Sequence, residues 1–289
     1  SMDSGLLRAI FREITIKQPF ERIPEPALVM EEQQSVASYA DSAAQGQALS
    51  GTHLYHCAQM CALIKPGDVV LDIGCGPAAL LLQVARLNPR AEFIGMDLSQ
   101  SMLEVAREAC HQQGIDNVQL IEDDMTRLGM IADRSVDVVI SSMALHHLEN
   151  LGQLEGTFRN ISRVLRNDRA IYLNDFGRLK TIESVDYFVE RASDGADAET
   201  LLDYRNSLLA AFSLEEFQTL AASYLGPCAK VYSTAFSPLM MVIRTPKRRC
   251  VNVMKPEFRR RYSALPASRQ ADVNQLRLFL RLGGLASAF

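Results

Sequence analysis

Two glycines and two acidic residues stand where the chain could wrap tightly around a small ligand. The segment Asp72-Ile73-Gly74-Cys75-Gly76 follows the apolar run 69–73 and precedes a helical stretch. Glycines 74 and 76 let the backbone turn sharply and approach a ligand closely. Asp97 ends the next apolar run, where a carboxylate can accept hydrogen bonds from both hydroxyls of a ribose. These residues predict a nucleoside site.

The acid at the end of the first run discriminates between two kinds of cofactor. A dinucleotide places its pyrophosphate at such a turn, and the carboxylate of Asp72 would repel it. S-adenosylmethionine carries a sulfonium and an ammonium group but no phosphate, so the same acid attracts it. The chain also lacks the Tyr-x-x-x-Lys pair of short-chain dehydrogenases. The residues therefore favour S-adenosylmethionine as the cofactor, with S-adenosylhomocysteine as its product.

Six motifs in order, within residues 51–176 and less closely 213–243, resemble the class I S-adenosylmethionine-dependent methyltransferases. The acid and alternate glycines of that family are matched by Asp72, Gly74 and Gly76, and its third glycine is replaced by Ala78. The stretch SSMALHHL, 141–148, resembles the small-molecule branch typified by ubiquinone and menaquinone biosynthesis enzymes. The Pro-Gly-Gly turn of that branch is replaced by Asn-Asp-Arg at 167–169, and Asn and Asp also tolerate tight turns.

The resemblance implies which residues hold the donor. The turn at 72–76 contacts the methionine end of the donor, Asp97 binds its ribose, and Leu98 and Met102 cover its adenine. Asp124 and the backbone N–H of Met125 meet the adenine amine. Tyr39 covers the methionine end, although its stretch also reads as a plain amphipathic helix. The implied cofactor-binding residues are Tyr39, Asp72, Gly74, Cys75, Gly76, Asp97, Leu98, Met102, Asp124, Met125 and Ser141.

His146 and His147 directly follow the fourth predicted strand, beside the expected methyl group. An imidazole titrates near neutral pH and can take a proton from an oxygen or nitrogen acceptor. Both are therefore candidate catalytic bases. The alternatives are that one packs inside and the other faces solvent, or that an ionised acceptor needs alignment alone.

A second group of histidines and cysteines falls at helical spacing. His53, His56, Cys57 and Cys61 could nominally bind zinc. They are interleaved with apolar residues on a helix that must pack against a sheet, so we expect core packing and no metal site.

Short apolar runs alternate with helical stretches through the middle of the chain. This rhythm predicts an α/β fold with a Rossmann-like, doubly wound, mostly parallel seven-stranded sheet, an antiparallel last strand and a helical cap or insertion. Strands are expected at 69–73, 92–96, 118–121, 136–140, 170–174, 229–233 and 239–243, and helices at 53–64, 79–87, 101–114, 153–165 and 213–224. The expected units are an N-terminal helical cap (1–50), the core (51–176 and 213–243), a helical insertion (177–212) and a basic, helical C-terminal extension (244–289).

The insertion leaves the sheet immediately after the fifth strand, whose carboxyl end faces the ligand edge. Its mixture of aromatic, aliphatic and charged residues predicts a lid over an apolar acceptor pocket, with Asn174, Asp175 and Arg178 at the rim. Such a pocket suits an aromatic or lipid-like acceptor. The alternative is a helical pair that widens the core or forms a homodimer interface.

Composition adds few further constraints. The 289 residues are 48% hydrophobic and carry a net charge of −4, which gives no overall attraction to nucleic acid or anionic lipid. Six cysteines without a Cys-x-x-Cys pair indicate free thiols in a reducing cytoplasm. The apolar runs fall far short of the ~20 residues that span a bilayer. We therefore expect a cytoplasmic protein.

The acceptor is less well defined than the donor. Enzymes of this fold that methylate base or amide nitrogens carry an Asn/Asp-Pro-Pro-aromatic run where this chain has Ser-Ser-Met-Ala, 141–144. We therefore expect transfer by direct displacement to an O, N, S or C atom of a small molecule. One alternative is a protein or RNA methyltransferase using the basic clusters 247–249 and 259–261, although nucleic acid is the less expected partner. Another is a donor-binding protein without transfer activity.

Overall fold

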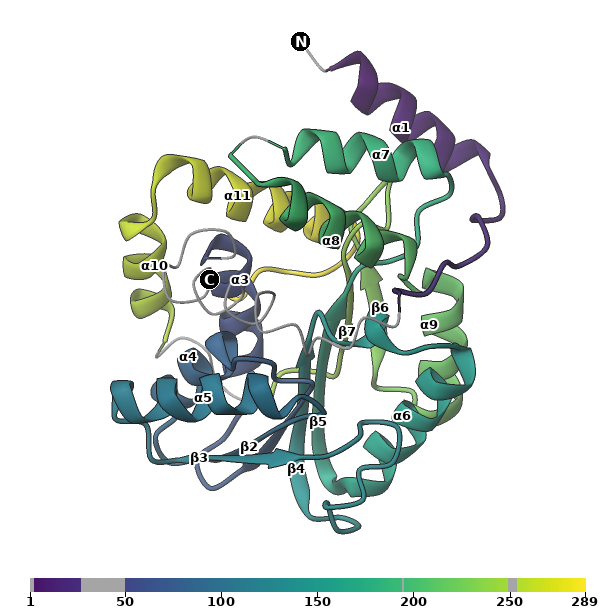
Figure 1. Ribbon diagram of the computed structural model, residues 1–289. Coiled ribbons are helices and arrows are strands. Elements are labelled where there is room, and N and C mark those ends of the chain that lie inside the picture. Colours follow the sequence, from purple (N-terminus) through teal and green to yellow (C-terminus); the bar gives the residue numbers. More distant parts are fainter. Residues whose placement is uncertain (1–2, 27–49, 194, 249–253) are drawn as a thin grey trace.

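A seven-stranded sheet forms the centre of the molecule in the computed structural model, which describes residues 3–26, 50–193, 195–248 and 254–289 (Figure 1). The strands are β1 (Val69–Ile73), β2 (Glu92–Asp97), β3 (Val118–Glu122), β4 (Val136–Ser142), β5 (Leu165–Asp175), β6 (Lys230–Ser233) and β7 (Met241–Arg244). Their order is β3-β2-β1-β4-β5-β7-β6. Only β7 runs antiparallel to its neighbours β5 and β6. The predicted fold class is confirmed.

The strand order reverses beside β1, which pairs with β2 on one side and β4 on the other. The turn after β1 therefore lies between the ends of β2 and β4. It is fixed to β2 because the N–H groups of Gly74 and Cys75 both donate to the carbonyl of Met96 at 2.9 Å. Ligands of open α/β sheets bind at such a reversal, outside the carboxyl ends of the strands.

Two helical layers cover the sheet (Figure 1). One face carries α3 (Ser50–Cys61), α4 (Ala79–Leu87), α5 (Gln100–Gln113), α10 (Lys255–Ala264) and α11 (Ala267–Leu282). The other carries α6 (Leu151–Val164), α9 (Leu214–Leu220) and the π-helical turn Ala221–Leu225. In α6 the buried side chains of Leu154, Phe158 and Ile161 recur at helical spacing, which gives one apolar stripe toward the sheet.

The C-terminal extension is part of this packing. Helices α10 and α11 lie against α3, and Phe258, Leu280 and Leu285 are fully buried in the same core as α3 and α4. Among the described helices, none is long and apolar enough to cross a membrane.

The insertion forms two helices, α7 (Ile182–Arg191) and α8 (Ala198–Leu209), as expected from its composition. Helix α1 (Ser4–Thr15) packs on α7 (Figure 1). Residues 16–26, here called the strap, have no regular structure. The strap is held by backbone bonds from Phe20 to Lys180 and from Ile23 to Leu209, at 3.2 and 3.1 Å.

Candidate active site

The two glycines of the turn after β1 serve different purposes. Both have a left-handed backbone, with φ of 72° at Gly74 and 54° at Gly76. A Cβ on Gly74 would lie 2.5 Å from the Cβ of Ala144, so the turn packs directly on the loop after β4. A Cβ on Gly76 would meet no heavy atom of the described residues within 4 Å. Gly74 therefore permits close packing, whereas Gly76 borders open space.

Ala78 stands where the third glycine of the motif would be, and it keeps a glycine-like backbone. Its φ is 66°, it occupies the N-cap position of α4 without a side-chain hydrogen bond, and it is 1% exposed. A left-handed conformation costs an L-residue roughly 1–2 kcal/mol. The substitution therefore preserves the shape of the turn.

Asp97 connects the turn after β1 to the start of α5. One carboxylate oxygen accepts the N–H of Gly76 at 2.9 Å, and the other accepts the N–H of Ser99 at 2.9 Å. Each oxygen has a further lone pair available for a hydroxyl group. The position at the end of β2 fits the predicted contact with a ribose.

Asp72 fits a cationic ligand because it is buried and none of the described residues gives it a counter-charge. Its side chain is 7% exposed, and no hydrogen bond to it comes from the described residues. Burial and the charge of Asp97 raise its pKa well above the ordinary value. A buried carboxylate without a partner is costly, and an ammonium group would remove that cost. The residues of this turn therefore fit S-adenosylmethionine.

The predicted adenine-binding residues are also close to the turn. Leu98 is 64% exposed although it is a large apolar residue, while Met102 is nearly buried. The Cε of Met125 lies 3.1 Å from the position of a Cβ on Gly74. One oxygen of Asp124 accepts the N–H and hydroxyl of Thr126 at 2.8 and 2.7 Å.

Three of the expected site residues, Ser141, Asn174 and Arg178, are buried or paired within the protein. Ser141 is fully buried, and its hydroxyl donates to the carbonyl of Ile73 at 2.9 Å, so it joins β4 to β1 and has no surface for a ligand. Asn174 is fully buried, and Arg178 pairs with Glu216 at 2.9 Å, so neither forms an open rim. Tyr39 lies outside the described residues.

Cys75 and the helical histidines pack within the protein. The half-buried thiol of Cys75 lies 3.6 Å from the carbonyl of Gly76, and burial raises its pKa. On α3, Cys57 and Cys61 are buried in the core, and Nδ1 of His56 lies 2.6 Å from the hydroxyl of Tyr172. The expected core packing of this helix is confirmed.

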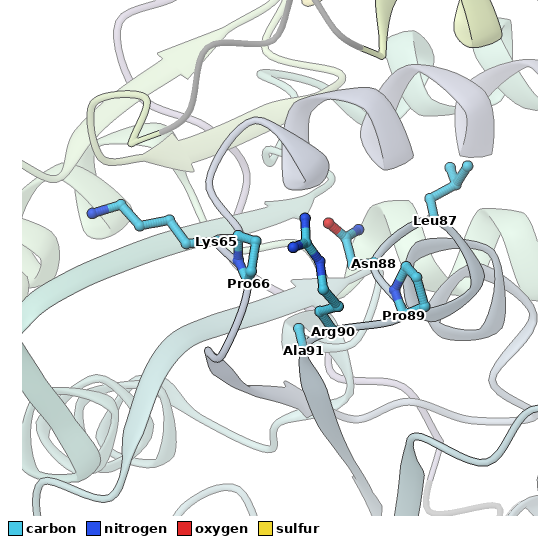
Figure 2. A pocket seen from close by; sticks show the side chains of 7 residues that line it. All are labelled: Lys65, Pro66, Leu87, Asn88, Pro89, Arg90 and Ala91. Carbon is cyan, nitrogen blue, oxygen red and sulfur yellow. The ribbon is translucent and has the colours of Figure 1, made fainter.

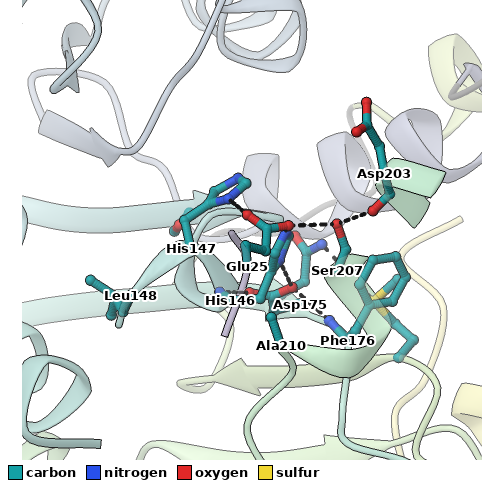
Figure 3. A network of polar contacts seen from close by, with 12 residues as sticks. Glu25, His146, His147, Leu148, Asp175, Phe176, Asp203, Ser207 and Ala210 are labelled. Atoms are coloured by element: carbon teal, nitrogen blue, oxygen red, sulfur yellow. Dashed lines mark hydrogen bonds and ion pairs between the residues drawn. The ribbon is translucent and has the colours of Figure 1, made fainter. Parts of the chain in front are cut away.

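The first catalytic candidate, His146, lies in a buried pair with Asp175 (Figure 3). Its Nδ1 is 2.7 Å from one carboxylate oxygen, and its backbone N–H donates to the other at 2.8 Å. His146 is 4% exposed and Asp175 is fully buried. Because a carboxylate can only accept, Nδ1 carries the proton, and in the neutral ring Nε2 is then the acceptor. Asp175, which ends β5, thus fixes both the ring and its tautomer.

The second candidate, His147, is paired with Glu25 of the strap (Figure 3). Its Nδ1 lies 2.5 Å from one oxygen of Glu25, and the other oxygen is 3.6 Å from Nε2 of His146. Partial burial opposes the charged imidazole, but the hydrogen bond and charge of Glu25 prevail and raise the pKa of His147. Glu25 also accepts a hydrogen bond from Ser207 of α8 at 3.0 Å. Glu25 was not among the expected site residues, and its only signal in the sequence is its place between Pro24 and Pro26.

Glu25, His146 and His147 are also a candidate metal-binding group. One ligand atom of each lies within 4.8 Å of the others. The direct contact of 2.5 Å between Glu25 and His147 is shorter than the separation of two ligands around one ion, since each ligand lies ~2.0–2.2 Å from zinc on a different side. The geometry therefore favours an ion pair.

A small cavity elsewhere is unrelated to this chemistry. It measures about 100 Å³ and is lined by residues 65–66 and 87–91. Figure 2 shows its walls, which come from the turns before β1 and before β2. These turns lie at the amino ends of the strands, the edge opposite Gly76 and Asp97.

Part of the chain matches a known family and several known proteins. Residues 64–206 match the family described as Methyltransferase domain. The chain is 33% identical over 109 residues to a malonyl-(acyl-carrier protein) O-methyltransferase of Legionella pneumophila, covering 37% of this chain and 36% of that protein. It is 31% identical over 107 residues to a demethylmenaquinone methyltransferase of Lactobacillus johnsonii, covering 36% and 42%.

One relative is named as an enzyme that acts on RNA. It is a U6 snRNA (guanine-N(2))-methyltransferase of Bos taurus, 32% identical over 112 residues, covering 38% of this chain and 22% of that protein. In each case the aligned part spans less than half of the relative's length.

Among solved structures, the plantazolicin methyltransferase BpumL in complex with S-adenosylhomocysteine superimposes with a TM-score of 0.57 at 17% identity, covering 83% of this chain and 88% of that one. This likeness shows the shared fold. The family match assigns residues 64–206 to the Methyltransferase domain family, and the turn of Asp72, Gly74 and Gly76 lies within these residues.

Proposed function

We propose that the protein transfers the methyl group of S-adenosylmethionine to a hydroxyl oxygen of a small-molecule acceptor by direct displacement. The observation that carries this proposal is the His146–Asp175 pair at the carboxyl ends of β4 and β5. The pair lies beside the turn after β1, because Ala144, two residues before His146, packs on Gly74 of that turn. A base is needed there when the acceptor must lose a proton, as a hydroxyl group must.

The residues of the pair divide the work. The bound donor supplies an electrophilic methyl group on its sulfonium. Nε2 of His146 accepts the proton of the hydroxyl group as the oxygen attacks the methyl carbon, and Asp175 stabilises the resulting imidazolium through Nδ1–H. A positioned base contributes about 10²–10⁴-fold to rate.

The insertion supports an apolar acceptor. Phe176, directly after β5, lies between His146 and Tyr204 of α8, with ring centroids 5.8 and 5.6 Å away. Ser207 of the same helix binds Glu25. We propose that α7 and α8 form a lid that keeps water from the acceptor. Its aromatic wall suits an aromatic or lipid-like molecule.

The basic clusters give little support to a nucleic-acid substrate. Arg248 is bound internally, to Asp68 at 2.9 Å and Asp168 at 3.3 Å. Arg260 and Arg261 both pair with Glu257, at 2.7 and 2.8 Å. These cations are therefore already paired with carboxylates, although binding to phosphates would need them free.

The test is transfer of labelled methyl groups. The protein is incubated with methyl-labelled donor and, separately, small-molecule extract, total RNA and total protein. We expect label in the small-molecule fraction, a large loss of it in His146→Ala, and no loss in the control His111→Ala at the exposed end of α5. Label in RNA or protein would contradict the proposed acceptor class. Absence of label everywhere would favour a binding protein without transfer activity.

A further inference from the structure

We infer that Glu25 is a positioning residue of the acceptor site, delivered by the strap to hold His147 as a cation beside the base His146. The inference rests on the proposed function and extends it to a segment outside the matched domain, 64–206. Three features of the described residues support it: the anchoring of the strap, the contacts of the Glu25 carboxylate, and the charges around them.

Arg22 anchors the strap to the loop after β4, which carries His146 and His147. Its Nε donates to the carbonyl of Ala210 at 2.6 Å, and its Nη1 donates to that of Glu149 at 2.7 Å. Its Nη2 donates to the carbonyls of His146, at 3.1 Å, and of Leu148. The guanidinium also stacks on the ring of Phe212, 3.9 Å from its centroid. One side chain thus fixes the strap, the loop after β4 and the end of α8 together.

The carboxylate of Glu25 is held three residues further on. One oxygen contacts Nδ1 of His147, while the other accepts from Ser207 and faces Nε2 of His146 at 3.6 Å. The two imidazole rings are 4.2 Å apart between centroids. Asp175 therefore contacts His146 directly, whereas Glu25 contacts His147 directly and lies 3.6 Å from His146.

This arrangement gives the two histidines different roles. Nδ1 of His146 is bonded to Asp175 and its Nε2 lies 3.6 Å from Glu25, whereas His147 is favoured as an imidazolium by Glu25, with Asp175 and Asp97 acting in the same direction. The other charged groups around Glu25 are Arg22 and Asp203. A cation beside the acceptor stabilises the negative charge that grows on its oxygen as the proton leaves. Pairs of titratable groups held in different states commonly divide acid and base roles.

The experiment compares Glu25→Gln with Glu21→Gln, which makes the same change of charge at an exposed position of the same strap. The imidazole signals of His147 are titrated by NMR in isotopically labelled protein. We expect the pKa of His147 to fall by about one unit or more in Glu25→Gln, as expected on removing an adjacent opposite charge, and to stay unchanged in Glu21→Gln. Glu25→Asp should restore part of the shift.

Turnover and donor binding are measured on the same variants. Glu25→Gln should lower kcat about tenfold or more, less than the ~10²–10³-fold of a direct contact to the reacting oxygen because Glu25 acts through His147. It should leave the affinity for S-adenosylhomocysteine within twofold of the wild type. An unshifted His147, or kcat equal to that of Glu21→Gln, would overturn the inference while the proposed function stands. Tight zinc binding that Glu25→Gln abolishes would also overturn it, because a metal-bound His146 cannot accept a proton. Absence of methyl transfer by the wild type would instead refute the proposed function itself.

Discussion

Lowering the pH from 8 to 5 should destabilise the protein through His56 on α3. Its imidazole is 2% exposed, and its Nε2 has no hydrogen-bond partner among the described residues. Burial, with a smaller effect from His53, lowers its pKa to about 3. In the unfolded chain the pKa is about 6.5, so below that pH only the unfolded state binds the proton. Stability is therefore present at high pH and lost as the pH falls below about 6.5, by about 2 kcal/mol at pH 5.

Urea unfolding at both pH values, in the wild type and His56→Phe, isolates this effect from the titration of carboxylates. The loss of unfolding free energy between pH 8 and 5 should be about 2 kcal/mol smaller in His56→Phe. His111→Phe, at an exposed position on α5, serves as the control and should retain the wild-type loss. An equal loss in the wild type and His56→Phe would refute the conclusion that His56 is held neutral in the core.

Three further predictions concern the donor site and the strap. Gly76→Ala should fold at a cost of about 1–2 kcal/mol in unfolding free energy and bind S-adenosylhomocysteine weakly in calorimetry. Gly74→Ala, whose Cβ would lie 2.5 Å from that of Ala144, should lose about 2 kcal/mol or more of unfolding free energy in urea. A larger loss of stability in Gly76→Ala than in Gly74→Ala would contradict both assignments. Asp72→Asn should raise the melting temperature of the free protein at pH 7, because the raised pKa of Asp72 means that its charged form opposes folding. The same variant should bind S-adenosylhomocysteine more weakly, and unchanged affinity would refute the cation site. Arg22→Met should lower the free energy of unfolding by about 3 kcal/mol or more, since four carbonyls lose their donor. A loss below about 1 kcal/mol, the contribution of a single hydrogen bond, would show that the strap is held by other contacts.

The sheet could be predicted because its signals are local. Each of the seven expected strands is present, and the largest error is at β5, which begins at Leu165 and not at residue 170. Residues 166–169 are polar and read as a turn, yet α6 runs directly into β5, whose first residue pairs with Val136. The docking of α10 and α11 could not be predicted, because it depends on contacts between residues such as Phe258 and a helix about 200 positions earlier in the chain.

Within the candidate site, the turn after β1 could be predicted from local residues, whereas the contacts of Ser141 and Glu25 could not. The turn of Asp72, Gly74 and Gly76 is a local motif whose backbone demands are visible in its residue types. The burial of Ser141 could not be predicted, because its hydroxyl bonds the carbonyl of Ile73, 68 positions earlier in the chain. Glu25 was missed because it reaches His147 across 122 positions of the chain, and no local pattern records such a contact.

The central claim is that the turn after β1, together with Asp97, binds S-adenosylmethionine. Calorimetry with S-adenosylhomocysteine and with NAD, on the wild type and Asp97→Ala, tests it most directly, with circular dichroism to confirm that the variant folds. The account predicts that the wild type binds S-adenosylhomocysteine and not NAD, and that Asp97→Ala loses about 1.5–3 kcal/mol of binding free energy, the worth of hydrogen bonds to a charged group. Tighter binding of NAD, or unchanged affinity for S-adenosylhomocysteine in a folded Asp97→Ala, would contradict it.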